Sequence, residues 1–401
     1  MRFTKPKVLV AMSGGVDSSV AAAMLVREGY EVVGCFMRLG SPGEELDSLV
    51  EYDEAKIACA PGKIKIGHQG CCSINDAADA RLVAAELGVP FYVVNFKKDF
   101  GRIIDHFVDE YAEGRTPNPC VRCNDWLKFG RLHQYAEQIG AEFVASGHYA
   151  RIGKEQAGGA ALLRGVDHGK DQSYVLFGVP RARLPRMLLP IGGFEKPAVR
   201  EMARNFGLPT FDKPDSQEIC FVPDNNYAGL VERRRPELAR AGAVIDAEGR
   251  RIGTHAGQHR FTIGQRKRLG IGGVTADVPL FVLRKDAATN TVVVGPRESL
   301  MAFGCIAGEA NWLVDEPAEG VWRDCWARYR YNTPAARAKF RRLEEANAAT
   351  PSGRRGRFEV VFVEPQQAVA PGQAVVLYDD AEPDVVVGGG WIESAAAGRT
   401  R

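Results

Sequence analysis

The feature that most constrains the fold is a glycine-rich loop between an apolar strand and a helix near the N-terminus. The segment KVLVAM (7–12) is a short apolar run, which is typical of a strand buried in a parallel sheet. The loop SGGVDSS (13–19) follows it, and the next residues have the composition of a helix that ends at Gly29. A loop that opens a helix directs backbone N–H groups at an anion, above all phosphate. We therefore expect an α/β sheet with a phosphate-binding turn.

The loop differs from the two best-known nucleotide-binding sequences. It lacks the lysine of G-x-x-x-x-G-K-[ST], and G-x-G-x-x-G is absent. Gly14 and Gly15 allow the backbone to approach a ligand closely. Asp17 suits a phosphate site if Mg²⁺ bridges the two anions or if the carboxylate orients a donor. The alternative interpretation is a plain strand-to-helix turn with capping serines, which the full strand–loop–helix context disfavours.

The rest of the chain divides by its pattern of apolar residues. Strands predicted at 31–37, 91–96 and 141–147 alternate with helices predicted at 77–87, 103–111 and 127–139, which indicates right-handed parallel βαβ units. Ligands of such sheets bind beyond the carboxyl ends of the strands. Later residues are first rich in Arg, Gly and Pro and then form short apolar runs between turns, as in a small barrel. We predict an α/β catalytic domain at 1–222, a small central basic domain at 223–287 and a C-terminal β-barrel at 288–396.

Charge and cysteine content narrow the class of function. The net charge is only +2, but residues 231–270 hold ten Lys and Arg against four Asp and Glu, and a second basic stretch covers 328–357. Such stretches suit a polyanion such as nucleic acid, although solvated surface is the alternative. No apolar run approaches the roughly 20 residues of a membrane span, and the N-terminus does not have the pattern of a signal peptide. We expect a cytoplasmic protein with no membrane partner, in which nine cysteines serve catalysis or metal binding.

Several motifs together resemble one known family. SGGVDSS resembles the pyrophosphate loop of the PP-loop ATPases (adenine nucleotide alpha hydrolase-like), which cleave ATP between its α and β phosphates. GRTPNPCVRCN (114–124), ASGHYAR (145–151), KDQSYVL (170–176) and KPDSQEICFVP (213–223) then resemble the tRNA-specific 2-thiouridylases, in the same order. The similarity continues through FTIGQRKRLG (261–270) and ARYRY (327–331). The resemblance implies ATP-dependent 2-thiolation of the wobble uridine of tRNA, with adenylation of the C2 oxygen and sulfur transfer from a cysteine persulfide.

The resemblance also implies roles for particular residues. Cys123 matches the catalytic thiol, and Cys220 matches the cysteine that carries persulfide sulfur. The positions matching the family's ATP contacts are Ala11, Met12, Ser13, Gly14, Gly15, Val16, Asp17, Ser18, Met37 and Gly147. Those matching contacts to the target base are Asn118, Pro119 and Cys120, and those matching other tRNA contacts are Lys170, Asp171, Gln172, Arg328 and Tyr329. The implied cofactors are ATP and Mg²⁺, and the implied partners are tRNA and a persulfide donor, either a cysteine desulfurase or a relay protein.

The chemistry requires an activated thiol. A thiolate is the competent nucleophile, and a cysteine with a pKa of about 8.5 is only slightly ionised near neutral pH. Arg115 and Arg122 are the nearest cations in the sequence that could lower the pKa of Cys123. In the implied cycle the Cys220 persulfide attacks the activated carbon and Cys123 attacks the bridging sulfur, which leaves a Cys123–Cys220 disulfide to be reduced.

Alternatives remain open at this stage. Family members have Asp or Cys at position 120, and Cys120, Cys123 and Cys220 could together hold an iron–sulfur cluster, or zinc with a fourth ligand. We prefer the persulfide route. The rival functions are lysidine synthesis, which uses no cysteines, and a non-catalytic tRNA-binding sulfur-relay protein.

Four further features lie outside this assignment. Cys71, Cys72 and His68 could suggest a metal, but their spacing fits no regular zinc pattern, and a loop beside the nucleotide is favoured. Residues 41–70 are longer than the usual loop of the family. His255 and His259 have the i, i+4 spacing that could bind a metal on a helix, but Gly253 and Gly257 disfavour a helix. The family resemblance points to an RNA-facing loop, which the surrounding positive charge supports. Arg268 stands where relatives commonly have Gly.

Overall fold

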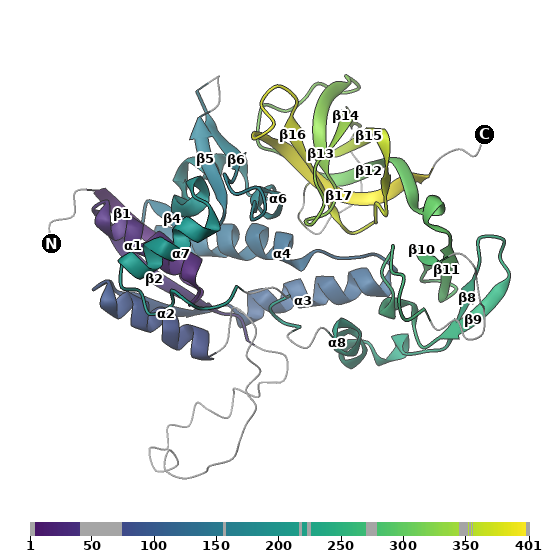
Figure 1. Cartoon of the computed structure of the whole chain (residues 1–401), viewed down its shortest axis with the longest axis horizontal. Helices are drawn as coiled ribbons and strands as arrows, with labels where there is room; N and C mark the ends of the chain where they lie inside the picture. The colour runs from purple at the N-terminus through teal and green to yellow at the C-terminus, as the bar shows by residue number, and fades with distance from the viewer. Residues whose placement is uncertain are drawn as a thin grey trace, which may run out of the picture.

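The computed structural model describes residues 5–40, 74–154, 158–215, 219–222, 226–269, 279–344, 352, 354 and 356–397. Figure 1 shows a catalytic domain near the N-terminus, a β-barrel beside it and a small sheet, β8–β11, at the far end of the long helix α3 (Lys97–Ala112). In the described part of the chain, no helix combines the length and the apolar character needed to cross a bilayer.

The catalytic domain is built on a parallel sheet of five strands. These are β1 (Lys5–Ala11), β2 (Tyr30–Arg38), β3 (Phe91–Asn95), β4 (Phe143–Ser146) and β7 (Met187–Leu188), in the order β3-β2-β1-β4-β7. Val8, Leu9 and Val10 are fully buried because helices cover both faces of β1. The predicted strands and their parallel pairing are confirmed.

Two hydrophobic clusters cover the two faces of this sheet. One cluster joins the sheet to α1 (Val16–Arg27), α2 (Ile74–Glu86) and α7 (Lys196–Asn205). The other joins it to α3 and α5 (Leu132–Gln138), and continues into the barrel through Val376, Tyr378 and Trp391. The catalytic domain and the barrel therefore share a core.

The cysteine motif starts a helical segment with an unusual middle. Asn118 caps α4 (Pro119–Arg122), since its side-chain oxygen accepts a hydrogen bond from the Val121 N–H at 3.4 Å, and proline occupies the first helical position. A π-helix, Cys123–Arg131, follows directly and leads into α5. The helix predicted at 127–139 therefore exists but begins earlier, and Cys120 and Cys123 lie one turn apart.

The central domain is a small four-stranded sheet with one helix. Helix α8 (Tyr227–Arg234) precedes β8 (Gly242–Ile245), β9 (Arg251–His255), β10 (Phe281–Asp286) and β11 (Thr291–Gly295), in the order β10-β11-β8-β9. The hairpin β10–β11 spans residue 287, where the sequence pattern places a domain boundary. Arg268 has a φ of 61°, which is why glycine suits this position.

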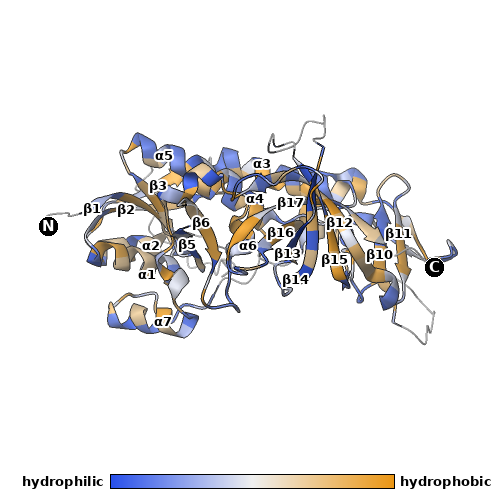
Figure 2. Cartoon of the chain, turned by 90° about the horizontal axis from the view of Figure 1, so that it is seen from above, coloured by the Kyte–Doolittle hydropathy of each residue, from blue (hydrophilic) through white to orange (hydrophobic). Residues whose placement is uncertain are grey.

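The C-terminal domain is a closed barrel. Its strands are β12 (Met301–Trp312), β13 (Arg323–Arg328), β14 (Ala336–Leu343), β15 (Arg357–Gln367), β16 (Ala374–Asp379) and β17 (Val386–Ala397), closed in the order β12-β15-β14-β13-β16-β17. Hydrophilic and hydrophobic residues alternate along its strands, as Figure 2 shows, because one face of each strand lines the barrel core. The predicted fold class is confirmed.

Shorter elements connect these parts. The hairpin of β5 (Ala150–Lys154) and β6 (Ala160–Arg164) leads to α6 (Ser173–Leu176). Short 3₁₀ helices occur at Arg181–Arg186, Pro190–Gly193, Pro236–Leu238, Gln258–Arg260 and Arg297–Leu300.

Candidate active site

The glycine loop lies at the point where the strand order of the sheet reverses. Strand β1 has β2 on one side and β4 on the other, so the loops that follow β1 and β4 meet at the carboxyl edge. A Cβ added to Gly147, just after β4, would lie 2.5 Å from the backbone nitrogen of Ser18. Gly14 has a φ of 73°, and a Cβ there would lie 2.2 Å from the Asp76 carbonyl oxygen. Only glycine lets these backbone segments approach one another so closely.

Serine hydroxyls hold the loop in shape. The Ser18 hydroxyl accepts a hydrogen bond from the Ser13 N–H at 3.1 Å and donates to the Gly15 carbonyl at 3.2 Å. The Ser19 hydroxyl donates to the same carbonyl at 2.8 Å. These bonds fix the turn before α1 begins at Val16. The preorganised helix N-terminus has the geometry that an anion site of the predicted kind requires.

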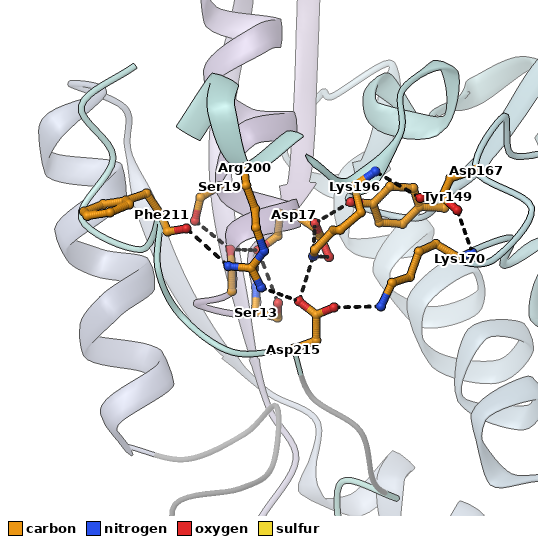
Figure 3. A network of polar contacts seen from close by, with 12 residues as sticks. Ser13, Asp17, Ser19, Tyr149, Asp167, Lys170, Lys196, Arg200, Phe211 and Asp215 are labelled. Atoms are coloured by element: carbon orange, nitrogen blue, oxygen red, sulfur yellow. Dashed lines mark hydrogen bonds and ion pairs between the residues drawn. The ribbon is translucent and has the colours of Figure 1, made fainter. Parts of the chain in front are cut away.

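Asp17, in the first turn of α1, is the centre of a polar network (Figure 3). The Tyr149 hydroxyl donates to its carboxylate at 2.8 Å. The Lys196 ammonium group lies 2.8 Å and 2.9 Å from its two oxygens, although the residues are 179 positions apart. Both partners come from neighbouring elements: Tyr149 follows β4, and Lys196 begins α7.

A second carboxylate, Asp215, extends this network. Lys196 contacts it at 2.8 Å, Lys170 at 2.9 Å and Arg200 at 2.9 Å. Burial alone would raise the pKa of Asp215, but the hydrogen bonds from Lys196 and Lys170 lower it to about 2. Sequence reasoning did not find Lys196 or Arg200, which stand in none of the motifs. Asp215 lies inside KPDSQEIC and was detectable there.

The two predicted catalytic cysteines share a hydrophobic environment. Cys123 and Cys220 are both partly buried and pack against the same core cluster, while Cys120 is exposed. The segment with Cys220 is anchored by Phe221, whose ring packs edge-on against Phe100 and Phe107 of α3, with centroid distances of 5.5 Å and 5.2 Å. The fold therefore brings two cysteines that are 97 positions apart in sequence to one core.

Arg122, next to Cys123, belongs to the barrel contact. It is 1% exposed, and its guanidinium group forms two hydrogen bonds to the Glu309 carboxylate, at 2.9 Å and 2.8 Å. The guanidinium also lies 3.9 Å from the ring centroid of Trp391. Arg115 pairs with Glu110 and Glu113. Carboxylates compensate both arginines, so neither acts as the uncompensated cation that the sequence suggests beside Cys123.

Family models match this architecture along its length. The model described as tRNA methyl transferase HUP domain matches residues 6–224, the tRNA methyl transferase PRC-barrel domain matches 230–296, and the aminomethyltransferase beta-barrel domain matches 303–392. The tRNA-specific 2-thiouridylase of Rhodopirellula baltica is 46% identical over 401 residues, which cover 97% of this chain and 96% of the relative. That of Geotalea uraniireducens is 44% identical and covers 99% of this chain and 97% of its own.

The chain belongs to the tRNA-specific 2-thiouridylase family. Similarity to solved structures is much weaker. A 4-thiouridine synthetase in complex with RNA and ATP shares 16% identity at a TM-score of 0.33, and covers 58% of this chain and 51% of that chain. An NMN synthetase from Francisella tularensis shares 16% identity at a TM-score of 0.30, covering 58% of this chain and 77% of its own.

Among the positions predicted to contact tRNA, Asp171 and Arg328 meet across the contact between the catalytic domain and the barrel. Asp171 is buried and accepts a hydrogen bond from Arg328 at 2.9 Å. The Gln172 side chain accepts from the Tyr149 N–H at 2.9 Å. Tyr329 is only 4% exposed. In this structure these side chains contact other parts of the protein. Lys170 is the more exposed member of the group, with 41% of its side chain accessible.

One other expectation is wrong, and a second lies outside the described residues. His255 and His259 are buried, and His259 lies 2.8 Å from the Glu232 carboxylate, so they stabilise the central domain and do not face RNA. Cys71, Cys72 and His68 lie outside the described residues, as does the long segment 41–70. Elsewhere, within the described ranges, no three His, Cys, Asp or Glu residues are grouped to hold a metal ion.

Proposed function

We propose that the chain is an ATP-dependent sulfurtransferase that converts the C2 oxygen of a tRNA wobble uridine to sulfur. Its support is the combination, in one catalytic domain, of a phosphate-binding turn with two cysteines that pack against one core. Family membership agrees with this combination, since curated relatives with near-complete coverage are named tRNA-specific 2-thiouridylases. A phosphate-binding loop alone fits many nucleotide-binding enzymes. The two cysteines favour a sulfurtransferase among them.

The loop at residues 13–19 is the proposed site for the phosphates of ATP. Its N–H groups and the helix dipole favour a polyanion, and Gly14 and Gly147 leave room for close backbone approach. Asp17 is the carboxylate at the loop that would hold Mg²⁺, since oxygen ligands suit this ion, and Lys196, which contacts both of its oxygens in this structure, would then have to move away. Bound there, Mg²⁺ would supply charge neutralisation for the phosphates. Met12 and Met37, at the ends of the neighbouring strands β1 and β2, are proposed to contact the nucleotide.

The cysteines are proposed to act in sequence on the adenylated uridine. The terminal sulfur of a persulfide on Cys220 attacks C2, and AMP leaves with the former C2 oxygen. The Cys123 thiolate then attacks the Cys220 sulfur, the S–S bond to the uridine sulfur breaks, and 2-thiouridine is released. The product on the protein is a Cys123–Cys220 disulfide, so each turnover needs a reductant and a new persulfide from a donor protein.

The tRNA is proposed to lie across the catalytic domain and the barrel. A cleft of about 660 Å³ between them is lined by Arg164, Arg328, Trp326 and Tyr331, among others. Arginine side chains suit the phosphate backbone, and aromatic rings suit unstacked bases. Cys120 is near this cleft: burial raises the pKa of Tyr331, the charge of Arg328 lowers it, and the nearby Asp171 and Cys120 raise it. Asn118, Pro119 and Cys120 are proposed to contact the target base.

The proposed cycle uses a persulfide in place of an iron–sulfur cluster. Within the described part of the chain, no group of three or more His, Cys, Asp or Glu residues is arranged to hold a metal ion. The persulfide route needs only Cys123 and Cys220.

A direct assay tests the proposal. Transfer RNA is incubated with the protein, ATP, Mg²⁺ and a persulfide donor, then digested and analysed for 2-thiouridine by mass spectrometry. The wild-type protein should form it, and Cys123→Ala and Cys220→Ala should not. The Cys120→Ala variant should retain thiolation, because the two-cysteine cycle does not use this thiol.

The contrary results are equally specific. Thiolation that persists in Cys123→Ala refutes the assigned nucleophile. Stoichiometric iron after anaerobic purification, lost in Cys120→Ala together with activity, would replace the persulfide with a cluster. Lysidine in the digest would indicate the other PP-loop enzyme, and tRNA binding with no modified base would indicate a relay protein.

A further inference from the structure

Three cations converge on one carboxylate beside the phosphate-binding loop. Asp215 receives Lys196 and Arg200 on one oxygen, at 2.8 Å and 2.9 Å, and Lys170 on the other, at 2.9 Å. The three cations come from separate places in the chain: Lys170 precedes α6, and Lys196 and Arg200 lie in α7. Figure 3 shows their side chains pointing at this carboxylate.

The same cations lie close to the loop that is proposed to hold ATP. The ammonium group of Lys196 contacts Asp215 and, within 2.9 Å, both oxygens of Asp17 in the first turn of α1. One side chain therefore connects the loop to the Asp215 carboxylate. Phosphoryl groups bound at residues 13–19 would approach Lys196 and its neighbouring cations directly.

Stability gives little reason for two of the three ion pairs. The side chains of Lys170, Arg200 and Asp215 are 41%, 29% and 24% exposed, and ion pairs with such exposure contribute little to folding, whereas the Lys196 side chain is 10% exposed. A cluster of lysines with an arginine fork is, in contrast, the usual recognition set for phosphate. A carboxylate offers the same kind of anionic oxygen acceptor as a phosphoryl group. Asp215 stays ionised at neutral pH because its pKa is near 2.

We propose that Asp215 stands in for a phosphoryl group of the nucleotide, and that ATP or the pyrophosphate product displaces it from Lys170, Lys196 and Arg200. The inference rests on the proposed ATP site and adds to it a second set of contacts to the terminal phosphates, made by these three cations. Asp215 is then a competitor of the ligand, and the cations exchange one anion for another when nucleotide binds. The displaced carboxylate lies five positions before Cys220 in the sequence.

The direction in which substitutions change the affinity for pyrophosphate tests the proposal. Inorganic pyrophosphate and ATP are titrated by calorimetry into the full chain, with and without Mg²⁺. Removing the competitor in Asp215→Asn should tighten pyrophosphate binding about fivefold, whereas removing a cation in Arg200→Gln should weaken it by a similar factor. Asp212→Asn, an exposed carboxylate in the same segment, is the matched control and should leave both affinities unchanged.

Affinity changes in the opposite directions would overturn the proposal. If Asp215→Asn weakens binding only when Mg²⁺ is present, Asp215 is a metal ligand and not a competitor. If Arg200→Gln leaves pyrophosphate affinity unchanged or tightens it, the cations hold Asp215 and not phosphate; this variant decides the question if Asp215→Asn fails to fold. Wild-type protein that binds neither ligand would contradict the proposed function itself, and wild-type binding with the wrong variant signs would refute this inference alone.

Discussion

Two ionic networks flank the proposed site, and they differ in exposure. At the phosphate end, the side chains of Asp17, Arg200 and Asp215 are between 24% and 31% exposed, around Lys196, whose side chain is 10% exposed. At the cysteine end, the side chains of Arg122 and Glu309 are 2% and 10% exposed. Charges that remain hydrated can exchange partners at small cost, while a buried pair that loses one member leaves an uncompensated charge. The comparison indicates that the phosphate end is adaptable, because its ion pairs can exchange partners. It also indicates that the cysteine end is rigid, because its buried pair holds the segment around Cys123 in place.

The rigid end depends on the barrel. Glu309 lies in β12 with a φ of 51°, a backbone conformation that costs a glutamate roughly 1 kcal/mol or more. Hydrogen bonds from Arg122 and from the Ser352 N–H, at 3.2 Å, hold it there. A second ion pair, Arg354 with Asp125 at 3.1 Å, joins the π-helix to the segment that contains Ser352. The barrel therefore positions the helix that starts at Cys123.

The largest expected effect comes from breaking the buried pair. Glu309→Ala should lower the free energy of unfolding by about 3–5 kcal/mol, because it leaves the Arg122 guanidinium buried without its carboxylate. Urea unfolding followed by fluorescence measures this. Glu319→Ala, which removes one of the two carboxylate partners of Arg342 at the surface and leaves Glu316, should change it by less than about 1 kcal/mol. Equal losses in the two variants would contradict the contrast between buried and exposed pairs.

The pH dependence of stability sharpens the same contrast. Burial and then the charge of Arg122 lower the pKa of His106 to about 4, against opposing effects of Glu110 and Glu309 and a smaller lowering by Arg115. The unfolded histidine takes up a proton below about pH 6.5 and the folded one does not. The contribution of His106 to the free energy of unfolding is therefore fully present above pH 6.5. This contribution falls by at most about 3 kcal/mol as the pH approaches 4. Unfolding at pH 7 and pH 4.5 measures the loss.

A neutral substitute isolates this contribution. His106→Gln keeps a hydrogen-bond acceptor for Arg122 and should flatten the pH dependence between 6.5 and 4. His133, whose pKa burial also lowers to about 4, titrates in the same window in both proteins, so only the difference between them reports His106. Asp215 adds little at pH 4.5 or above, because the carboxyl is ionised in the folded protein, with a pKa of about 2, and mostly ionised in the unfolded chain, with a pKa of 3.8. Identical curves would show that the histidine at the barrel contact does not couple to folding.

At the adaptable end, function should be affected more than stability. Lys196→Met removes the ammonium group between Asp17 and Asp215 and should raise the KM for ATP about ten- to a hundredfold, the effect of a lost charge-assisted hydrogen bond. The melting temperature should move by only a few degrees. Lys339→Met, at an exposed barrel position, is the control. A large loss of stability with an unchanged KM would mean that this network supports the fold.

The smallest effect concerns tRNA. Arg266, Lys267 and Arg268 are exposed, and none forms an ion pair with another described residue. Changing all three to Gln should weaken tRNA binding and reduce the slope of log affinity against log salt by about 0.7–0.9 for each phosphate that is no longer neutralised. Removing three other exposed charges, Arg81, Arg323 and Lys339, should leave the slope unchanged. Equal slopes for all proteins would place the basic segment away from tRNA.

Local sequence was enough to predict much of this molecule. The run KVLVAM followed by SGGVDSS predicted a buried strand and an anion-binding turn because strand burial and helix capping depend on neighbouring residues. Cys123 and Cys220 were found through motifs, and Arg268 was marked by the glycine that relatives prefer at its position. Their side chains' partners were not predictable in this way, and the histidines at 255 and 259 were placed on a surface although they are buried.

What the sequence alone determined is the order of elements, the fold class and the chemistry available at single positions. The tertiary structure decided which charges meet: Lys196 with Asp17 across 179 positions, and Arg122 with Glu309 across 187. An ion pair has no periodicity and no local signature, since its energy depends only on distance and burial in the folded chain. The residues that shape the proposed site therefore became visible only once the sheet edge and the barrel were in place.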